Sequence, residues 1–376
     1  MKPHQRDPLR LAVIGTGHLG RIHARLASQL PSIDLIAVVD SLAGAREAVA
    51  AETGVRGVAD HRDLIGEIDA AIVATPTTSH QQVASELMQA GIHTLIEKPL
   101  ATTFKECEQL VQLARHQNLV LQVGHVERFN PALTSVKDKL SDPKFIDARR
   151  TSGYTFRSTD VGVVMDLMIH DIDIVLALVQ SPVKNVEAIG LSVLGNHEDM
   201  VNARLHFASG CVASLTASRV SYQAMRVMQV FTSRGFAAID FGSRSANLVE
   251  PVEAVLRREY TTDGMSLEQQ QESRDQLFST LLIQRAIEGA EINAIEQEQI
   301  DFATAIGEQR RPQVDGADGR DAVAVAELIL EQVDAHAWDG TQLGRQGPFA
   351  MPALPVLSGA GQWCEKSPSM PQRKAG

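Results

Sequence analysis

Asp166 and His170 lie four residues apart in the segment DVGVVMDLMIHDIDIVLAL, which begins at Asp160. On a helix this spacing places both side chains on one face. There the carboxylate can hold the imidazole and stabilise its protonated form, as a general base requires. The alternative is a core or helix-cap histidine. Asp171 and Asp173 could add metal ligands, but adjacent helical positions face different ways, and the sequence has no second His or Cys cluster. We therefore expect acid–base chemistry and no metal.

A second reactive side chain is Lys98, in Glu97-Lys98-Pro99, directly after an apolar run over residues 93–96 that predicts a strand. Ligands of a doubly wound sheet bind at the carboxyl ends of its strands, so Glu97 and Lys98 are placed to reach a cofactor. Pro99 favours an extended backbone at Lys98 and thereby restricts the base of that side chain. The alternative is an ordinary surface lysine before a turn.

The glycine turn Gly15-Thr16-Gly17-His18-Leu19-Gly20 is a complete G-x-G-x-x-G between a predicted strand over 11–14 and a predicted helix over 22–30. Gly15 permits the tight turn, Gly17 lets the backbone approach a pyrophosphate, and Gly20 lets helix and strand pack closely. The helix N-terminus then faces the phosphates. The alternative is a glycine-rich turn without a ligand.

Asp40 ends the second predicted strand, 20 residues after Gly20. A carboxylate there accepts hydrogen bonds from a ribose 2′-hydroxyl and repels a 2′-phosphate, so we expect NAD rather than NADP. Arg46 is the nearby cation that could assist a 2′-phosphate. Thr75 and Pro76 follow a third predicted strand and are expected to line the cofactor.

These side chains need a sheet to position them. Residues 9–125 read as apolar strands alternating with helices, which is typical of a parallel sheet covered on both faces. Beyond Gly124 the pattern has period two, as in 201–207, 211–219 and 226–232, and indicates a largely antiparallel sheet. Helices are predicted again at about 279–309 and 319–335. After Gly340 the chain is rich in Pro, Gly, Ser and Gln.

Composition narrows the class of protein. The 376 residues carry a formal net charge of −11, and only 4% are aromatic, so a nucleic-acid partner is not expected. The apolar run over 161–179 is interrupted by charged residues, so no membrane insertion is expected. Three cysteines without a CxxC suit a reducing cytoplasm.

GTGHLG with Asp40, ATPTTSH at 74–80, EKPLATT at 97–103 and the Asp166/His170 segment together resemble the glucose–fructose oxidoreductase/inositol dehydrogenase (Gfo/Idh/MocA) family over about residues 9–335. The resemblance implies an α/β fold: an N-terminal Rossmann domain with a doubly wound parallel sheet, and a C-terminal α/β domain with a large, mostly antiparallel open sheet. It implies a homodimer or homotetramer through that sheet, Lys98, Asp166 and His170 as the catalytic set, and a cis Lys98–Pro99 peptide. The expected divisions are 1–125 for NAD, 126–338 for substrate and oligomerisation, and 339–376 as a flexible or arm-like tail.

Two longer strings, GHVERFNP at 124–131 and DVGVVMDLMIHDID at 160–173, resemble UDP-N-acetylglucosamine 3-dehydrogenases. Such enzymes oxidise the sugar 3-hydroxyl to a ketone, which an aminotransferase can then convert on the way to amino sugars such as those of lipid A. A diphosphate needs arginine forks. Arginines in or near the second domain that could border the cleft are Arg128, Arg149, Arg150, Arg157, Arg219 and Arg226; the expected substrate-binding residues are Arg128, Phe129, Asn130, Arg157 and Arg219.

Three questions stay open at this point. His170 is the expected base, with Lys98 as the alternative. The substrate could instead be another sugar, a polyol or a UDP-hexuronic acid. A non-catalytic NAD-binding sensor or scaffold on the same fold is the alternative of a different class; it would not need Lys98, Asp166 and His170 together.

Overall fold

The computed structural model describes residues 7–156, 161–338 and 346–349. Its first layer is a parallel sheet in the order β3-β2-β1-β4-β5-β6. Its central strands are mainly apolar and buried because helices cover both faces of the sheet. The strands of this sheet are β1 (Leu9–Ile14), β2 (Ile33–Val39), β3 (Arg56–Val58), β4 (Ala70–Val73), β5 (His93–Glu97) and β6 (Leu121–Gly124).

Four helices connect these strands, and the predicted parallel sheet is confirmed. Chain order reverses between β1 and β4, so the loops after β1 and β4 border a crevice at the carboxyl edge, where such sheets bind ligands. The last of the four begins with a capping box in which Thr103 and Glu106 each bond the other's backbone N–H. The helices are α1 (His18–Ala27), α2 (Ala43–Thr53), α3 (Thr77–Gln89) and α4 (Phe104–Gln117).

The second layer is an eight-stranded sheet in the order β14-β13-β12-β11-β7-β10-β9-β8, antiparallel except for the β7/β10 pair. The predicted, mostly antiparallel second sheet is thus confirmed. Its strands are β7 (Pro143–Thr151), β8 (Val183–Leu191), β9 (Met200–Phe207), β10 (Val212–Ser218), β11 (Met225–Thr232), β12 (Gly235–Asp240), β13 (Ser245–Pro251) and β14 (Leu282–Glu288).

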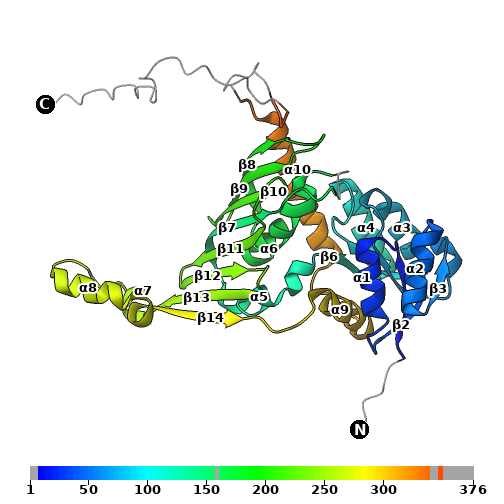
Figure 1. The fold of residues 1–376 in the computed structure, drawn as a ribbon, viewed down its shortest axis with the longest axis horizontal. Helices are drawn as coiled ribbons and strands as arrows, with labels where there is room; N and C mark the ends of the chain where they lie inside the picture. The colour runs from blue at the N-terminus through cyan, green and yellow to red at the C-terminus, as the bar shows by residue number, and fades with distance from the viewer. Residues whose placement is uncertain (1–6, 157–160, 339–345, 350–376) are drawn as a thin grey trace, which may run out of the picture.

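Helices cover only the inner face of this sheet, the face toward the first domain (Figure 1). The inner-facing residues, such as Ala148, Met228 and Val230, are fully buried, and the alternate positions face outward. The short α5 (Pro131–Thr134) follows β6. The inner helices are a π-helical turn, η4 (Val164–Met168), α6 (Ile169–Val179) and α10 (Gly316–Ala335).

The prediction of a helix over 279–309 is wrong for its first part. A π-helical turn, η5 (Leu277–Leu281), is followed by the edge strand β14, which pairs with β13, and the α-helix α9 begins only at Ala294 and ends at Glu308. Backbone pairing overrides the helical pattern of LIQRAIE, because the strand completes the ladder on β13. Between β13 and β14 the chain runs out beyond the sheet as α7 (Glu253–Leu256) and α8 (Leu267–Asp275), whose residues are not buried (Figure 1).

The chain crosses back to the first domain after β14. Helix α9 packs on α1, and its Phe302 is fully buried with Leu11, Val13 and Leu35 of the parallel sheet. Helix α10 then returns to pack between α4 and the inner face of the second sheet. The two layers are therefore joined twice, and the crevice of the first sheet opens toward the N-terminal turn of α6.

Candidate active site

The glycine turn has the open backbone that a pyrophosphate needs. Gly15 has φ +96° and lies so close to Ala74 and Thr75 that a Cβ would meet their backbone, and a Cβ on Gly20 would overlap the carbonyl of Gly15. At Gly17, by contrast, a Cβ would meet nothing within 4 Å, and the N-terminus of α1 has no side-chain cap. His18 and Leu19 are exposed in the first turn. The donor-rich helix end thus faces open space, which fits a dinucleotide.

Asp40 lies beside this turn, as expected. Its Oδ2 accepts hydrogen bonds from the backbone N–H and the hydroxyl of Thr16, both at 2.8 Å, and its Oδ1 accepts from Leu42 N–H. Burial alone would raise the pKa of Asp40, but the bonds from Leu42 and Thr16 and the nearby Arg46 lower it, so the carboxylate stays ionised. Arg46 donates to the backbone oxygen of Asp40 at 2.6 Å. Both carboxylate oxygens of Asp40 thus accept hydrogen bonds within the chain, and its role toward a ribose hydroxyl stays a prediction.

The loops after β4 and β5 are tied together by His80. This buried ring has Nε2 2.9 Å from the Thr75 carbonyl and Nδ1 2.9 Å from the Pro99 carbonyl. Burial lowers its pKa. Thr75 and the exposed Pro76 consequently stand at the edge of the crevice, and the predicted cis peptide between Lys98 and Pro99 is confirmed.

Lys98 reaches across the crevice to the second domain. Its Nζ donates to the carboxylate Oδ1 of Asp166 at 3.1 Å and to the backbone oxygen of Asp166 at 2.6 Å. Both side chains are partly shielded, with exposed fractions of 15% and 23%. The pair joins the end of β5 to η4, so it brings the Glu97-Lys98-Pro99 motif and the Asp166/His170 segment into one site.

Asp166 does not make the expected contact with His170. Residues 164–168 form a π-helical turn, so a spacing of four no longer stacks the two side chains. His170 is half-buried in the first turn of α6, and its Nδ1 is buried without a hydrogen-bond partner among the described residues. Burial, together with the positive charges of Lys98, Arg150 and Arg226, holds the pKa of His170 well below its usual value. The imidazole is therefore neutral and can accept a proton.

His125 is a site residue that the sequence did not single out for chemistry. It follows β6, is fully buried, and packs edge-on against His170 with ring centroids 6.2 Å apart. Neither of its ring nitrogens has a partner among the described residues, and burial with the charges of Arg128 and Lys98 lowers its pKa to about 3. The only signal in the sequence is its place at the end of β6, in GHVERFNP.

Comparison with known proteins agrees with this geometry. Residues 9–125 match the model of the GFO_IDH_MocA oxidoreductase family, NAD-binding Rossmann fold, and residues 133–238 match the GFO/IDH/MocA C-terminal domain. The chain belongs to the Gfo/Idh/MocA family. It is an oxidoreductase with an NAD-binding domain, and in the described residues no helix is both long and apolar enough to span a membrane.

Among its relatives is the UDP-N-acetylglucosamine 3-dehydrogenase of Acidithiobacillus ferrooxidans, which is 34% identical over 87% of this chain and 98% of the relative. A structure of that enzyme superposes with a TM-score of 0.78 over 88% of this chain and 99% of the other. The scyllo-inositol 2-dehydrogenase (NAD(+)) of Bacillus subtilis is 29% identical over 57% of this chain and 68% of the relative.

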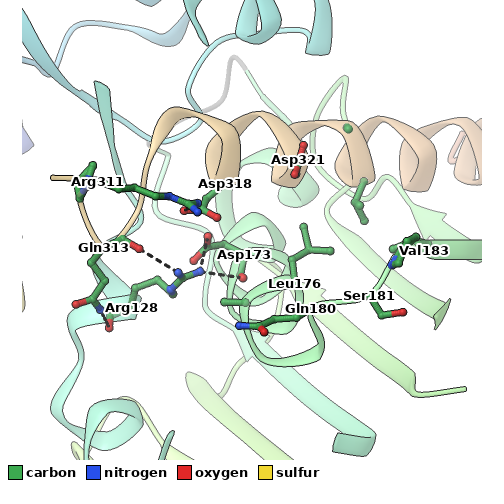
Figure 2. A pocket seen from close by; sticks show the side chains of 15 residues that line it. Arg128, Asp173, Leu176, Gln180, Ser181, Val183, Arg311, Gln313, Asp318 and Asp321 are labelled. Carbon is green, nitrogen blue, oxygen red and sulfur yellow. Dashed lines mark hydrogen bonds and ion pairs between the residues drawn. The ribbon is translucent and has the colours of Figure 1, made fainter. Parts of the chain in front are cut away.

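The arginines expected to bind substrate lie mostly in internal ion pairs. Arg128 binds Asp173 at 3.2 Å and the Gln313 carbonyl at 3.2 Å, in a separate cavity of about 960 Å³ between α6 and α10 (Figure 2). Arg219 is buried and binds Asp199 at 2.7 Å and the Val161 carbonyl. Both guanidinium groups therefore brace loops and helix ends in this structure.

The other residues expected to bind substrate are Phe129, Asn130 and Arg157. Phe129 is buried in a hydrophobic cluster to which both domains contribute. Asn130 caps α5 and donates to Glu127 at 2.8 Å and to the Phe241 carbonyl at 3.2 Å, so its buried amide bonds the protein itself. Arg157 lies outside the described residues.

A buried polar cluster joins the site to α9. His23 Nε2 lies 2.7 Å from Glu97 Oε1, and Glu298 on α9 lies beside both, with no hydrogen-bond partner for its carboxyl oxygens among the described residues. Gln299 Nε2 donates to His23 Nδ1 at 2.9 Å and to the His23 carbonyl at 3.2 Å. Because the amide N–H groups face two acceptors, His23 carries its proton on Nε2 and donates it to Glu97.

Three ligand atoms of this cluster lie within 4.8 Å of one another, as a metal site would need. With its proton on Nε2, His23 would have to release that proton before it could bind a metal. Burial and the charge of Glu97 hold the pKa of Glu298 well above its usual value, so Glu298 is neutral. The cluster then holds a protonated acid beside an ionised Glu97.

Glu298→Gln should stabilise the protein at neutral pH. The folded chain keeps the Glu298 proton while the unfolded chain loses it above the ordinary pKa, so wild-type stability falls as pH rises from about 4.5. Relative to wild type, E298Q should gain up to about 1.4 kcal/mol for each pH unit until the folded pKa is reached. Chemical unfolding at pH 5, 6, 7 and 8 measures this trend.

Glu291→Gln, at an exposed position before α9, is the matched control and should show no such trend. If E298Q instead loses stability, and if a chelator lowers the stability of wild type to the same level, the cluster holds a cation and the protonated-acid assignment is wrong.

Proposed function

We propose that this enzyme oxidises the 3-hydroxyl of UDP-N-acetylglucosamine to the 3-keto sugar with NAD as acceptor. The observation that carries the proposal is the neutral His170 beside the Lys98–Asp166 pair, at the carboxyl edge of the NAD-binding sheet. The 34% identical relative named for this reaction supports the choice of substrate.

His170, Lys98 and Asp166 have separate roles in this reaction. A secondary alcohol releases hydride readily only as its O–H proton departs, so a base must lie within hydrogen-bond reach. His170, held neutral, accepts that proton, and the Lys98 ammonium donates a hydrogen bond to the same oxygen. Asp166 orients Lys98. When bound, NAD supplies the hydride acceptor, and the glycine turn, Asp40 and Thr75 would hold it.

Asp40→Ala should weaken NAD binding far more than NADP binding. The variant removes the acceptor for the 2′-hydroxyl, but it also removes the charge that repels a 2′-phosphate, while Arg46 remains. The loss of one charged hydrogen bond should raise the Kd for NAD by about tenfold or more. Fluorescence titration with NADH and NADPH measures both; an unchanged preference contradicts the role of Asp40.

Mass spectrometry of UDP-N-acetylglucosamine incubated with enzyme and NAD tests the substrate. The expected product has lost two hydrogens and is trapped as an amine by an added aminotransferase, the class of enzyme that would consume a 3-keto sugar in amino-sugar and lipid A synthesis. Oxidation only of an inositol, another sugar or a UDP-hexuronic acid would identify the alternative substrate. NADH fluorescence that stays constant across the whole panel would favour a non-catalytic NAD-binding protein.

We also propose that copies of the chain associate through the outer face of the eight-stranded sheet, in the cytoplasm. No described helix covers that face, and Phe145, Phe231 and Phe236 form a cluster on it, with ring centroids 6.0 and 5.1 Å apart. These three rings are half-buried, and a partly exposed aromatic group on an uncovered sheet face favours burial against a partner. The solution mass from light scattering tests this: a dimer or tetramer is expected.

A further inference from the structure

Arg226 differs from the other arginines that border the second domain. Arg128, Arg150 and Arg219 pair with buried aspartates, and Arg149 lies on the outer face of the sheet beside Asp147. Arg226 has no ion pair or hydrogen bond from its guanidinium to any residue in the described part of the chain, and its side chain is exposed. Of the five described arginines in this group, it alone has a guanidinium group whose N–H donors are not used within the described chain.

The register of the sheet places Arg226 on the inner face. It lies directly opposite Arg150 of β7, and its carbonyl accepts the Phe241 N–H. The Arg150 guanidinium lies over the ring of Phe241, at 5.7 Å from its centroid, and bonds Asp171, the neighbour of His170. Because cross-strand neighbours share a face, Arg226 lies on the face that carries the catalytic helix.

The charge of Arg226 acts at the reacting centre. After burial, Lys98, Arg150 and His125, it is a further cause of the low pKa of His170, and it also acts on Asp171. A guanidinium this near the site, with no carboxylate partner in the described chain, is complementary to an anionic group of a ligand. Its planar fork matches two phosphate oxygens at once.

Two exposed aromatic rings lie on loops at the same end of the sheet. Ser221 N–H donates to the Ser152 carbonyl, which joins the loop after β7 to the loop before β11. On these two loops Phe156 is 82% exposed and Tyr222 is 96% exposed. Rings of this kind stack on nucleobases, so the surroundings of Arg226 suit a nucleotide better than a free sugar.

We propose that Arg226 binds the diphosphate of a nucleoside-diphosphate sugar and so determines specificity for nucleotide-linked substrates. The assignment rests on the proposed function and extends it, because it names the residue that separates a UDP-sugar from a free sugar or polyol. Arg226 thereby takes the part that the sequence assigned to Arg128 and Arg219.

Arg226→Ala tests the assignment, with Arg226→Lys and Arg149→Ala as companions. R226A should raise the KM for UDP-N-acetylglucosamine, and the Kd for UDP measured by calorimetry, by about tenfold to a hundredfold. Its Kd for NADH should stay close to wild type, because the cofactor is held by the first domain. R226K should recover part of the binding because it keeps the charge without the fork. R149A, on the neighbouring strand but the opposite face, should match wild type.

One result would contradict the assignment of Arg226 alone, and another would contradict the proposed function. If wild type binds UDP and R226A binds it equally well, the assignment of Arg226 is wrong and the proposed substrate stands. If wild type neither binds UDP nor oxidises any UDP-sugar, the proposed function is wrong and the assignment falls with it.

Discussion

Replacement of His170 by alanine is expected to lower kcat by about 10²- to 10⁴-fold, the usual contribution of a positioned general base. The Kd for NADH should change little, because the glycine turn and Asp40 belong to the first domain. The reason is the imidazole at the N-terminal turn of α6, whose lowered pKa keeps it in the unprotonated form that a general base needs. Stopped-flow reduction of NAD and fluorescence titration with NADH measure the two quantities.

Lys98→Met and Asp166→Asn separate His170 from the alternative base. If Lys98 only polarises the hydroxyl, K98M should retain a kcat above that of H170A, and D166N should resemble K98M, because Asp166 contacts Lys98 rather than His170. Turnover of H170A near the wild-type rate, with K98M inactive, would assign the base to Lys98.

Arg150→Met is expected to reduce the free energy of unfolding by about 3–5 kcal/mol. The buried guanidinium bonds Asp171 through Nη2 at 2.8 Å and Glu127 through Nη1 at 2.7 Å, so its removal leaves two carboxylates buried without a counter-charge. Urea denaturation measures the loss. The sequence suggested a cleft arginine here, whereas the structure shows an internal ion triad beneath the catalytic helix.

A triple variant, Arg150→Met with Asp171→Asn and Glu127→Gln, removes all three charges and should recover much of the lost stability. Wild-type stability of R150M alone would mean that the triad does not hold the start of α6.

The first domain could be predicted well because its signals are local. The glycine turn, Asp40 and Lys98 each follow a strand end directly, and a strand end fixes where the next residue lies. The second domain was harder, because the role of each arginine depends on partners distant in sequence. Arg219, for example, binds Asp199, and Arg128 binds Asp173.

The prediction that Asp166 contacts His170 was wrong for a different reason. A spacing of four implies a shared face only in a regular α-helix, and nothing in the residues marks the π-helical turn before Ile169. Likewise, an unpartnered side chain can be recognised only after its neighbours are placed. Arg226 and Glu298 therefore stood out in the structure and not in the sequence.

The return of α9 to the parallel sheet has a practical consequence for dividing the protein. The family model of the nucleotide-binding part ends at residue 125, which suggests a place to cut the chain. A fragment ending there would leave the pocket for Phe302 open to water and remove the amide of Gln299 from His23. The first domain is thus completed by a segment encoded about 170 residues later, and a self-standing cofactor-binding module would have to carry that helix as well.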